Sequence, residues 1–311
     1  MECKMNEQKK CATIVNTSID TRAIQTNQSN MQSTPIKLPR VAAVHDICGF
    51  GKCSLATALP VISACGVEVC PIPTGIFSAN TNFPNFQFTD FTEQMPGFIK
   101  HLKECGVSFD AVYSGFLGSA AQIGYIKDLV GSFSPKYAII DPVMGDNGAI
   151  YKFYTPEMCE NMRGLAAIAD IATPNLTEAC VLTGEDYGKF AKGGGEIKDL
   201  AEKLIEIGAK NVVVTGIERG ELLYNCVLSE DGEYSEREIE LLPFRMHGTG
   251  DLFSSVLAGG VLCGHSLADS VDSAALFVYE VMQYSETVEN FHERGACFEP
   301  FLYRLRGGLC K

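Results

Sequence analysis

From residue 40 onward the chain alternates short apolar runs with longer amphipathic segments, and this alternation restricts the fold more than any other feature. The apolar runs are rich in β-branched residues and lack interleaved polar positions, which is typical of strands buried on both faces. Strands are predicted at Val41–Val44, Val67–Cys70, Ala111–Tyr113, Ala138–Asp141, Ile168–Ile171 and Val212–Val214. Helices are predicted at 51–65, 90–105, 119–132, 156–166, 175–183, 196–208, 249–263 and 267–285. Right-handed crossovers between such elements give a doubly wound, mostly parallel α/β sheet with helices on both faces.

The C-terminal third adds a different pattern. Two β-type segments, 221–228 and 234–242, flank Ser229-Glu230-Asp231-Gly232. An Asp-Gly turn between such segments is typical of a β-hairpin. The sequence therefore predicts an antiparallel hairpin at one edge of the sheet.

Residues 1–38 differ from the rest in composition, because they are rich in Gln, Asn, Ser, Thr and Lys and lack helical or strand periodicity. We predict a disordered polar tail here and one α/β domain over residues 39–311. The N-terminus is polar from its first residues, without the apolar core of a secretory signal, so a cytoplasmic location is expected.

The charge balance and hydropathy exclude two classes of partner. The chain carries 25 Lys and Arg against 38 Asp and Glu, a net charge of −13. This balance disfavours a protein that binds nucleic acid over a broad basic surface. No apolar run is long enough for a transmembrane helix, so no membrane partner is expected.

The chain has 13 cysteines, and no pair has the C-x-x-C spacing of a structural zinc site. The closest pairs, Cys48/Cys53 and Cys65/Cys70, are both separated by four residues. In a reduced compartment most of these cysteines are expected to be small buried apolar side chains. A nucleophilic role for Cys48 or Cys53 is an alternative, but no His lies at a diagnostic spacing.

Two glycine-rich phosphate motifs fail to match. In a P-loop that ends at Gly51-Lys52, Asp46 would occupy the first glycine position and Cys53 the position of the hydroxyl residue. The G-x-G-x-x-G pattern of dinucleotide-binding folds is also incomplete.

A better phosphate motif is His247-Gly248-Thr249-Gly250-Asp251, which lies where a loop becomes an apolar helix. The helix N-terminus and glycine amides favour a phosphate group. An Asp beside that phosphate is explained if it accepts a proton from an incoming hydroxyl group. The alternative is that Asp251 only caps the helix.

Two more polar clusters follow predicted strands. Asp141 and Asp146 come after one strand and suit a metal or a metal–nucleotide complex, although a polar turn is the alternative. Thr173, Asn175 and Glu178 follow the next strand, where a capping box is the alternative. Because the carboxyl ends of parallel strands form the usual ligand site, three such clusters in order favour function over capping alone.

These motifs resemble the ribokinase superfamily and, within it, the vitamin B6 kinases. Gly248–Asp251 is similar to the superfamily's Gly-Thr-Gly-Asp, Asp141–Asp146 to the B6 branch's Asp-Pro-Val-(Met/Leu)-Gly-Asp, and Thr173–Glu178 to its Thr-Pro-Asn-x-x-Glu. Val212–Gly216 resembles the strand that ends in a nucleotide-contacting Thr, and Ile76–Thr81 resembles Phe-Ser-x-His-Thr. The similarity extends from about residue 40 to residue 285 in register.

The resemblance implies a ribokinase-like kinase that phosphorylates the 5′-hydroxymethyl group of pyridoxal, pyridoxine or pyridoxamine with ATP. Asp251 would be the general base, and the amides of Gly248, Thr249 and Gly250 would form the anion hole. The implied ATP-binding residues are Asp141, Tyr154, Thr173, Asn175, Thr215, Gly248 and Gly250. Asp141, Asp146 and Glu178 would order Mg²⁺ and a monovalent cation, K⁺ or Na⁺. Asp46, Thr74, Phe116 and Asp251 would contact the acceptor, and a homodimer is expected.

The sequence departs from the family pattern around the acceptor ring. His45-Asp46 stand where many members have Gln-Ser, Phe116 replaces a pocket Tyr, and Asn80 replaces the lid His. Two alternatives stay open: a related kinase of a hydroxymethylpyrimidine or a sugar, and a B6-binding protein without catalytic activity. Retention of Asp251 and Glu178 argues against the second, because binding alone needs no base.

Overall fold

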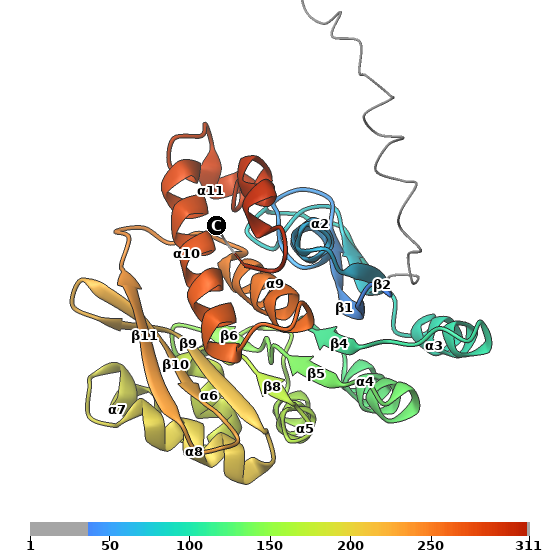
Figure 1. Cartoon of the computed structure of the whole chain (residues 1–311), viewed down its shortest axis with the longest axis horizontal. Helices are drawn as coiled ribbons and strands as arrows, with labels where there is room; N and C mark the ends of the chain where they lie inside the picture. The colour runs from blue at the N-terminus through green and yellow to red at the C-terminus, as the bar shows by residue number, and fades with distance from the viewer. Residues whose placement is uncertain (1–36, 310–311) are drawn as a thin grey trace, which may run out of the picture. The chain divides into compact units, whose positions relative to one another are not determined.

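In the computed structural model, which describes residues 37–309, the six predicted strands, the predicted hairpin and one further strand form a nine-stranded sheet (Figure 1). Its order is β11-β10-β9-β8-β5-β4-β1-β2-β3. The central strands, from β2 to β9, pair in parallel, whereas β3, β10 and β11 pair antiparallel. The strands are β1 (Arg40–Cys48), β2 (Glu68–Phe77), β3 (Phe88–Asp90), β4 (Ala111–Ser114), β5 (Tyr137–Ile140), β8 (Ile171–Ala172), β9 (Asn211–Arg219), β10 (Leu222–Leu228) and β11 (Tyr234–Glu240). The predicted doubly wound, mostly parallel sheet is confirmed.

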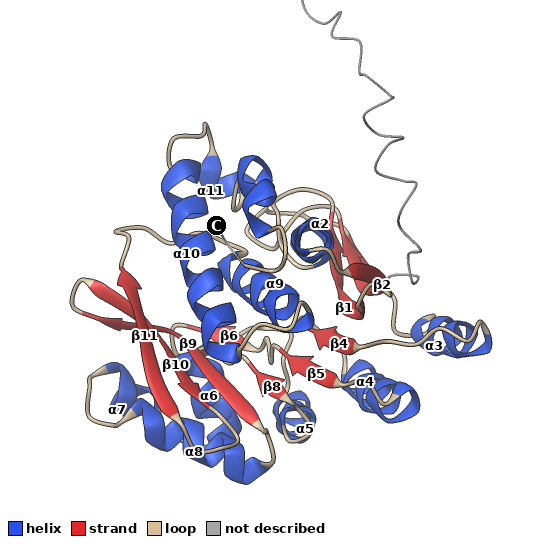
Figure 2. Cartoon of the chain, in the orientation of Figure 1, coloured by secondary structure: helices blue, strands red, loops and turns tan. Residues whose placement is uncertain are grey.

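Helices cover both faces of this sheet (Figure 2). One face packs against α2 (Leu55–Cys65), α9 (Thr249–Leu262) and α10 (Leu267–Ser285). The other packs against α3 (Met95–Glu104), α4 (Ala120–Phe133), α5 (Pro156–Ala166), α6 (Leu176–Thr183) and α8 (Ile197–Ile207). Shorter elements are α7 (Tyr187–Ala191), α11 (Phe291–Arg294) and the 3₁₀-helix η1 (Glu299–Leu305).

The two cores follow the alternation of side chains along the strands. Val41 of β1 faces α2 and α9, whereas Ala42 and Val44 face the opposite helical layer. On the first face α9 lies very close to α2, since a Cβ at Gly259 would come within 2.4 Å of Cys65 Sγ. Glycine in the middle of α9 therefore permits a tight helix contact, at some cost in helix propensity.

The predicted edge hairpin is present as β10 and β11, and its turn is closed by a 2.9 Å hydrogen bond from Gly232 N to Ser229 O. Several boundaries differ from the prediction. The helix predicted over 90–105 begins only at Met95, and Asp90 instead ends β3, an antiparallel edge strand that was not predicted. The strands β1, β2 and β9 continue four to seven residues past their predicted ends. The helix predicted over 51–65 begins only at Leu55, because residues 49–54 form a turn. The strand predicted over 168–171 moves to Ile171–Ala172, because the amides of Ile168 and Ala169 still bond to the end of α5.

A small second sheet was not predicted. It consists of β6 (Gly145–Asp146) and β7 (Ala149–Ile150), which form an antiparallel hairpin after the carboxyl end of β5. Two-residue strands carry too little periodicity to be recognised from sequence.

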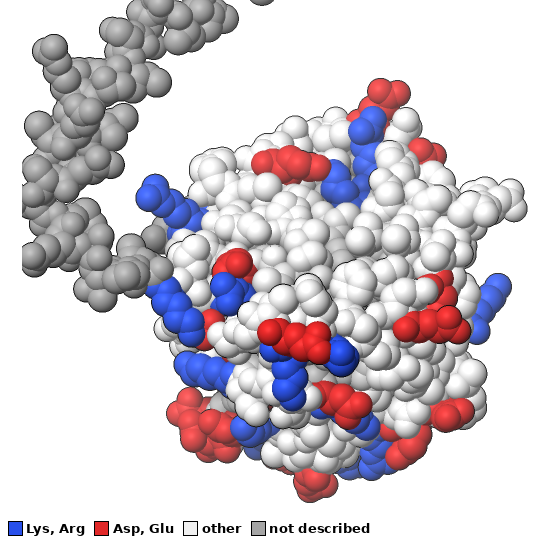
Figure 3. All heavy atoms as spheres, turned by 90° about the vertical axis from the view of Figure 1, so that its right-hand side faces the viewer, with Lys and Arg blue, Asp and Glu red and all other residues white. Residues whose placement is uncertain are grey.

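Several other expectations concern the surface and the thiols. The predicted tail lies almost entirely outside the described residues. Between residues 37 and 309 no helix combines the length and apolarity that crossing a bilayer requires. On the face that Figure 3 shows, acidic and basic side chains are interspersed among broad uncharged areas. Six of the ten described cysteines are buried, in agreement with the expectation of small apolar side chains.

Candidate active site

The site lies where the winding of the sheet changes direction. From β1 the chain crosses to β2 on one side, and the later strands β4, β5 and β8 lie on the other side. Ligands of such sheets bind beyond the carboxyl ends of the strands at this switch point. The predicted residues that follow β1, β4, β5 and β8 therefore belong to one edge of the sheet.

The N-terminus of α9 provides an anion-binding geometry. Gly248 is its N-cap with φ 82°, and a Cβ there would come within 2.3 Å of Lys52 O, so only glycine fits. The amides of Thr249, Gly250 and Asp251 belong to the first turn of α9, where the helix itself supplies them no backbone acceptor. A Cβ at Gly250 would meet nothing within 4 Å. Free amides beside open space at a helix N-terminus can hold a phosphoryl group.

Asp251 lies in the first turn of α9 and faces the segment that follows β1. Its Oδ2 accepts a 2.9 Å hydrogen bond from Ser54 N. Burial raises the pKa of Asp251 to about 7, the Ser54 amide opposes this shift, and the charge of Asp46 adds to it. A carboxylate whose pKa lies near neutrality can accept a proton from a substrate hydroxyl at physiological pH.

Asp46, near the end of β1, is 4% exposed. Its Oδ1 accepts a 2.6 Å bond from Ser54 Oγ and its Oδ2 a 3.4 Å bond from Cys48 Sγ. Burial raises the pKa of Asp46, although both of these hydrogen bonds lower it. No basic side chain contacts this carboxylate within the part of the chain that the structure describes.

Ser54 connects the two carboxylates, and the sequence analysis missed it. Its hydroxyl bonds Asp46 and its amide bonds Asp251, while its own backbone is left-handed at φ 51°, ψ −131°. A non-glycine residue with positive φ at such a place marks local strain at a functional site. Its position directly before an apolar helix was the available signal, because serine is a common N-cap.

The remaining acceptor-side residues lie together on β2 and after β4. Thr74 Oγ1 donates a 3.1 Å hydrogen bond to Phe116 O, and Gln122 Nε2 donates a 2.8 Å bond to Thr74 O. The Phe116 ring lies 6.0 Å from the ring of Phe77 in an edge-to-face arrangement. The structure therefore brings Thr74 and Phe116 together, as predicted for one pocket.

His45 does not share the environment of Asp46. It is fully buried, its ring centroid lies 4.4 Å from that of Tyr113, and neither ring nitrogen has a hydrogen-bond partner among the described residues. Burial lowers the pKa of His45 to about 3, so the ring is neutral. Gly115 packs against the same ring, since a Cβ at this glycine would come within 2.2 Å of the His45 imidazole.

Beyond β5, Asp141 is buried and is held by α9. Its Oδ2 accepts a 3.0 Å hydrogen bond from Ser254 Oγ, and that hydroxyl also lies 3.2 Å from Thr173 Oγ1. Burial, followed by the charge of Asp251, raises the pKa of Asp141 to about 8. Ser254 is a second residue that the sequence analysis missed, and it links the predicted Asp141 and Thr173.

Asn175 and Glu178 form the predicted capping box at the start of α6. They also hold the β6–β7 hairpin: Asn175 Nδ2 donates to Gly145 O at 2.9 Å, and Glu178 Oε1 accepts from Met144 N at 3.0 Å. A third bond of 2.8 Å runs from Gly148 N to Thr177 Oγ1. Burial and the charge of Asp141 raise the pKa of Glu178 well above its usual range.

The other predicted nucleotide and metal residues are more dispersed. Thr215 lies beside Asn175 through a parallel β-bridge. Asp146 is exposed, and among the described residues its carboxylate accepts hydrogen bonds only from Asn147. Tyr154 is buried and donates its hydroxyl to Leu117 O at 3.0 Å. Asp141, Asp146 and Glu178 do not form a tight ligand cluster; among residues 37–309 only Asp46, Cys48 and Cys53 do so.

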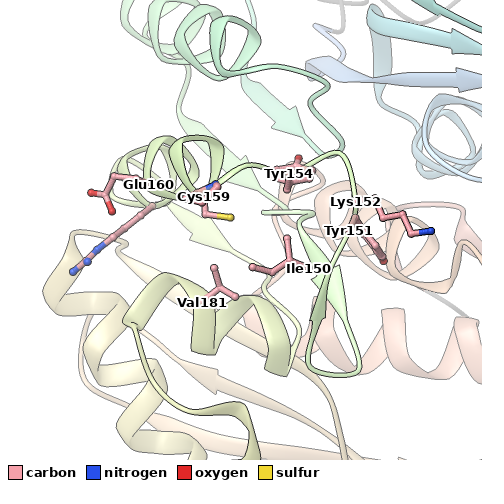
Figure 4. A pocket seen from close by; sticks show the side chains of 9 residues that line it. Ile150, Tyr151, Lys152, Tyr154, Cys159, Glu160 and Val181 are labelled. Atoms are coloured by element: carbon pink, nitrogen blue, oxygen red, sulfur yellow. The ribbon is translucent and has the colours of Figure 1, made fainter.

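A cavity of about 510 Å³ lies beside the β6–β7 hairpin (Figure 4). Its wall includes Ile150 of β7, Tyr151 directly after the hairpin, Cys159 of α5 and Val181 of α6. Tyr154 also lines it, and its ring centroid lies 6.3 Å from that of Phe116.

Comparison with known proteins agrees with this arrangement. The model of the phosphomethylpyrimidine kinase family matches residues 55–295. The chain belongs to this family. The family match contains the Asp141, Glu178 and Asp251 segments, though not Asp46 and Ser54.

Similar proteins are named either pyridoxal kinase or phosphomethylpyrimidine kinase. A pyridoxal kinase PdxY of Granulibacter bethesdensis is 29% identical, over 75% of this chain and 85% of its own length. A Bacteroides thetaiotaomicron protein described as a phosphomethylpyrimidine kinase, in a crystal form with pyridoxal, is 34% identical with a TM-score of 0.81, covering 86% of this chain and 96% of its own. Pyridoxal kinase of Lactobacillus plantarum is 25% identical with a TM-score of 0.80, covering 86% and 97%.

Proposed function

We propose that this chain is an ATP-dependent kinase that phosphorylates the 5′-hydroxymethyl group of pyridoxal, pyridoxine or pyridoxamine. The observation that carries the proposal is the placement of Asp251. Its carboxylate lies in the first turn of a helix whose free amides form an anion site, and Ser54 connects it to the buried Asp46. Relatives named pyridoxal kinase support the choice of acceptor.

Asp251 acts as the general base. Its ionised form accepts the proton of the acceptor hydroxyl as that oxygen attacks the γ-phosphorus of ATP. The amides of Gly248, Thr249 and Gly250 face the transferred phosphoryl group and stabilise its charge. Most of the catalytic effect then comes from positioning and from these fixed dipoles.

Asp46, Thr74 and Phe116 bind the acceptor ring. Between residues 37 and 309 no basic side chain pairs with the buried Asp46 carboxylate, so a protonated pyridine nitrogen complements it. Phe116 offers an aromatic surface to a flat heterocycle, and Thr74 borders the same pocket.

The nucleotide side of the site consists of Thr173, Asn175, Thr215 and Tyr154. The acidic groups for Mg²⁺ and a monovalent cation, K⁺ or Na⁺, are Asp141, Asp146 and Glu178. Asp141 and Glu178 fit this role because both are buried and neither has a basic partner among the described residues. When bound, Mg²⁺ neutralises phosphate charge. Since Glu178 already accepts two backbone amides, it would reach the ion through water. The homodimer and the cytoplasmic location stay predictions.

An ADP-release assay tests the proposal and separates its alternatives. The full chain, ATP and Mg²⁺ are combined with pyridoxal, pyridoxine, pyridoxamine, hydroxymethylpyrimidine or ribose. Turnover of a B6 vitamer well above the other acceptors is the expected result. Preference for hydroxymethylpyrimidine or ribose would assign the related kinase activity, and vitamer binding without ADP release would assign a binding protein.

A further inference from the structure

Three potential metal ligands converge at the end of β1. Cys48 Sγ lies 3.0 Å from Cys53 Sγ and 3.4 Å from Asp46 Oδ2. The ligand atoms of all three residues lie within 4.8 Å of one another, and all three residues are buried. No other group of three His, Cys, Asp or Glu residues in the described part of the chain converges in this way.

The local backbone explains this convergence. Ile47 and Ser54 form an antiparallel bridge, so the turn Gly49–Lys52 folds Cys53 back onto Cys48. The thiols pack in a small apolar cluster with Phe77, and Phe86 and Phe116 cover its edge. This arrangement excludes bulk water from the thiols and holds them at the acceptor side of the site.

We propose that Asp46, Cys48 and Cys53 form a binding site for a thiophilic divalent cation of the Zn²⁺ type. Zinc binds sulfur at about 2.3 Å and carboxylate oxygen at about 2.0–2.2 Å, which places two tetrahedral sulfur ligands about 3.8 Å apart and sulfur and oxygen about 3.6 Å apart. The present sulfur–oxygen distance of 3.4 Å already matches. The two sulfurs, now 3.0 Å apart, would separate slightly by side-chain rotation.

The surroundings of the three ligands suit a metal. Ser54 Oγ donates to Asp46 Oδ1 at 2.6 Å, which leaves Oδ2 directed at Cys48. Such a bond to the second carboxylate oxygen orients a metal-binding carboxylate. Cys48 also lines a cavity of about 240 Å³ beside the turn Gly49–Lys52, which gives an entry path and room for water as the fourth ligand.

Binding is an exchange of protons for the metal. Two S–H bonds break, two Zn–S bonds form, two protons leave to solvent, and the carboxylate supplies the third ligand without a redox change. The ligand set then carries three negative charges against the two positive charges of the cation.

The site has a consequence for catalysis that rests on the proposed function. If Asp46 receives the pyridine nitrogen, the cation and the acceptor use the same carboxylate. The cation should then inhibit competitively with the vitamer and leave the affinity for nucleotide unchanged. Metal binding itself needs neither substrate, so it can be tested separately from kinase activity.

The binding experiment uses the full chain under reducing conditions without ATP or vitamer. Cd²⁺ serves as the spectroscopic probe through thiolate charge-transfer absorption, and Zn²⁺ affinity is measured against a chelator. We expect one tight site, which Cys48→Ser and Cys53→Ser each weaken by at least about 100-fold, because even residues that only orient ligands change metal affinity 10–100-fold. The matched control is Cys105→Ser, which removes an exposed thiol 3.6 Å from His101 Nε2 and should change nothing.

Unchanged Zn²⁺ affinity in Cys48→Ser and Cys53→Ser would overturn the proposal, as would loss of the signal in Cys105→Ser. A measurement on the unmodified chain guards against variants that fail to fold. Bound Zn²⁺ should protect Cys48 and Cys53 from alkylation, read by peptide mass, and should raise Tm more than Mg²⁺ does. Equal alkylation with and without Zn²⁺ would contradict the site. Failure of this test together with normal ADP release would leave the proposed kinase activity intact.

Discussion

The backbone amide of Ser54 donates a 2.9 Å hydrogen bond to Oδ2 of Asp251, from a position 197 residues earlier in the chain. The hydroxyl of the same serine holds Asp46 at 2.6 Å. One residue therefore orients the proposed base and the proposed acceptor-binding carboxylate together. Its left-handed backbone, at φ 51°, is what directs both donors toward the site.

Replacement of Ser54 should separate strain from hydrogen bonding. Ser54→Ala and Ser54→Gly both remove the bond to Asp46, so both should raise KM for the acceptor, while the amide bond to Asp251 keeps the fall in kcat smaller. Only glycine relieves the positive φ, so Ser54→Gly should be more stable than Ser54→Ala by about 1–2 kcal/mol. Urea unfolding measures this difference. Equal stability of the two variants would show that the backbone is unstrained here.

Asp251→Asn tests the proposed base. The amide side chain can still accept a hydrogen bond from Ser54 N, so the fold should persist, but it cannot take the acceptor proton. We expect kcat to fall by about 10²–10⁴-fold, the range for loss of a general base. The control is Asp128→Asn, an exposed carboxylate on α4, which should keep full activity. A near-normal kcat for Asp251→Asn would remove Asp251 from this role.

Two glycines of the anion site should respond differently to alanine. In Gly248→Ala the alanine would have to adopt the positive φ of 82°, and its Cβ would come within 2.3 Å of Lys52 O. This variant should therefore lose both stability and activity. Gly250→Ala meets no neighbour within 4 Å and improves helix propensity, so Tm should hold or rise. Its methyl group nevertheless borders the phosphoryl site and can displace the phosphoryl group from the retained amide, so kcat/KM should fall, by at most about the 10²-fold that loss of one anion-stabilising donor costs. Thermal melting and ADP release measure both, and full activity of Gly250→Ala would contradict the anion site.

The pH dependence of kcat/KM should show an acid limb. Because burial raises the pKa of Asp251 to about 7, the base is protonated and inactive below that pH. Activity should therefore rise as pH increases through about 7. The charge of Asp46 contributes to this raised pKa, so Asp46→Asn should shift the limb to lower pH even as it raises KM. An acid limb that stays in place in Asp46→Asn would show that the two carboxylates do not interact.

Stability of the chain without ligands should also depend on pH through Asp141. Its pKa is about 8 in the folded chain, against about 3.9 for an unperturbed Asp, so the folded state holds this proton more tightly. The resulting stabilisation is complete below about pH 4 and is lost as pH rises toward 8. Asp141→Asn carries no such proton. Its free energy of unfolding, relative to the unmodified chain, should increase between pH 5 and pH 8, and parallel urea curves at both pH values would contradict this.

The pattern of the sheet could be predicted because it depends on local periodicity. The six parallel strands and the β10–β11 hairpin are visible as apolar runs and turn residues. The β6–β7 hairpin was not predictable, because tertiary bonds from Asn175, Thr177 and Glu178 hold it rather than its own sequence.

In the candidate site, too, the residues placed by local sequence could be predicted, whereas those placed by tertiary contacts could not. Asp141 comes directly after β5, and Asn175 and Glu178 lie at the start of the helix that follows β8, so their edge of the sheet could be predicted. Ser54 was missed because its role depends on a left-handed turn that carries it to a helix almost two hundred residues away. The spacing of Cys48 and Cys53 was visible, but their 3.0 Å approach and the carboxylate beside them depend on that same turn.

The three bonds between the start of α6 and the β6–β7 hairpin have a mechanical consequence. They join Asn175, Thr177 and Glu178 to the first strand of the hairpin, to its turn and to Met144, the residue before it. A hairpin fastened in this way cannot flap independently over a nucleotide. Any movement of the hairpin would therefore carry the start of α6, and Glu178 with it, so a hinge should be sought in the segments that lead into and out of this unit.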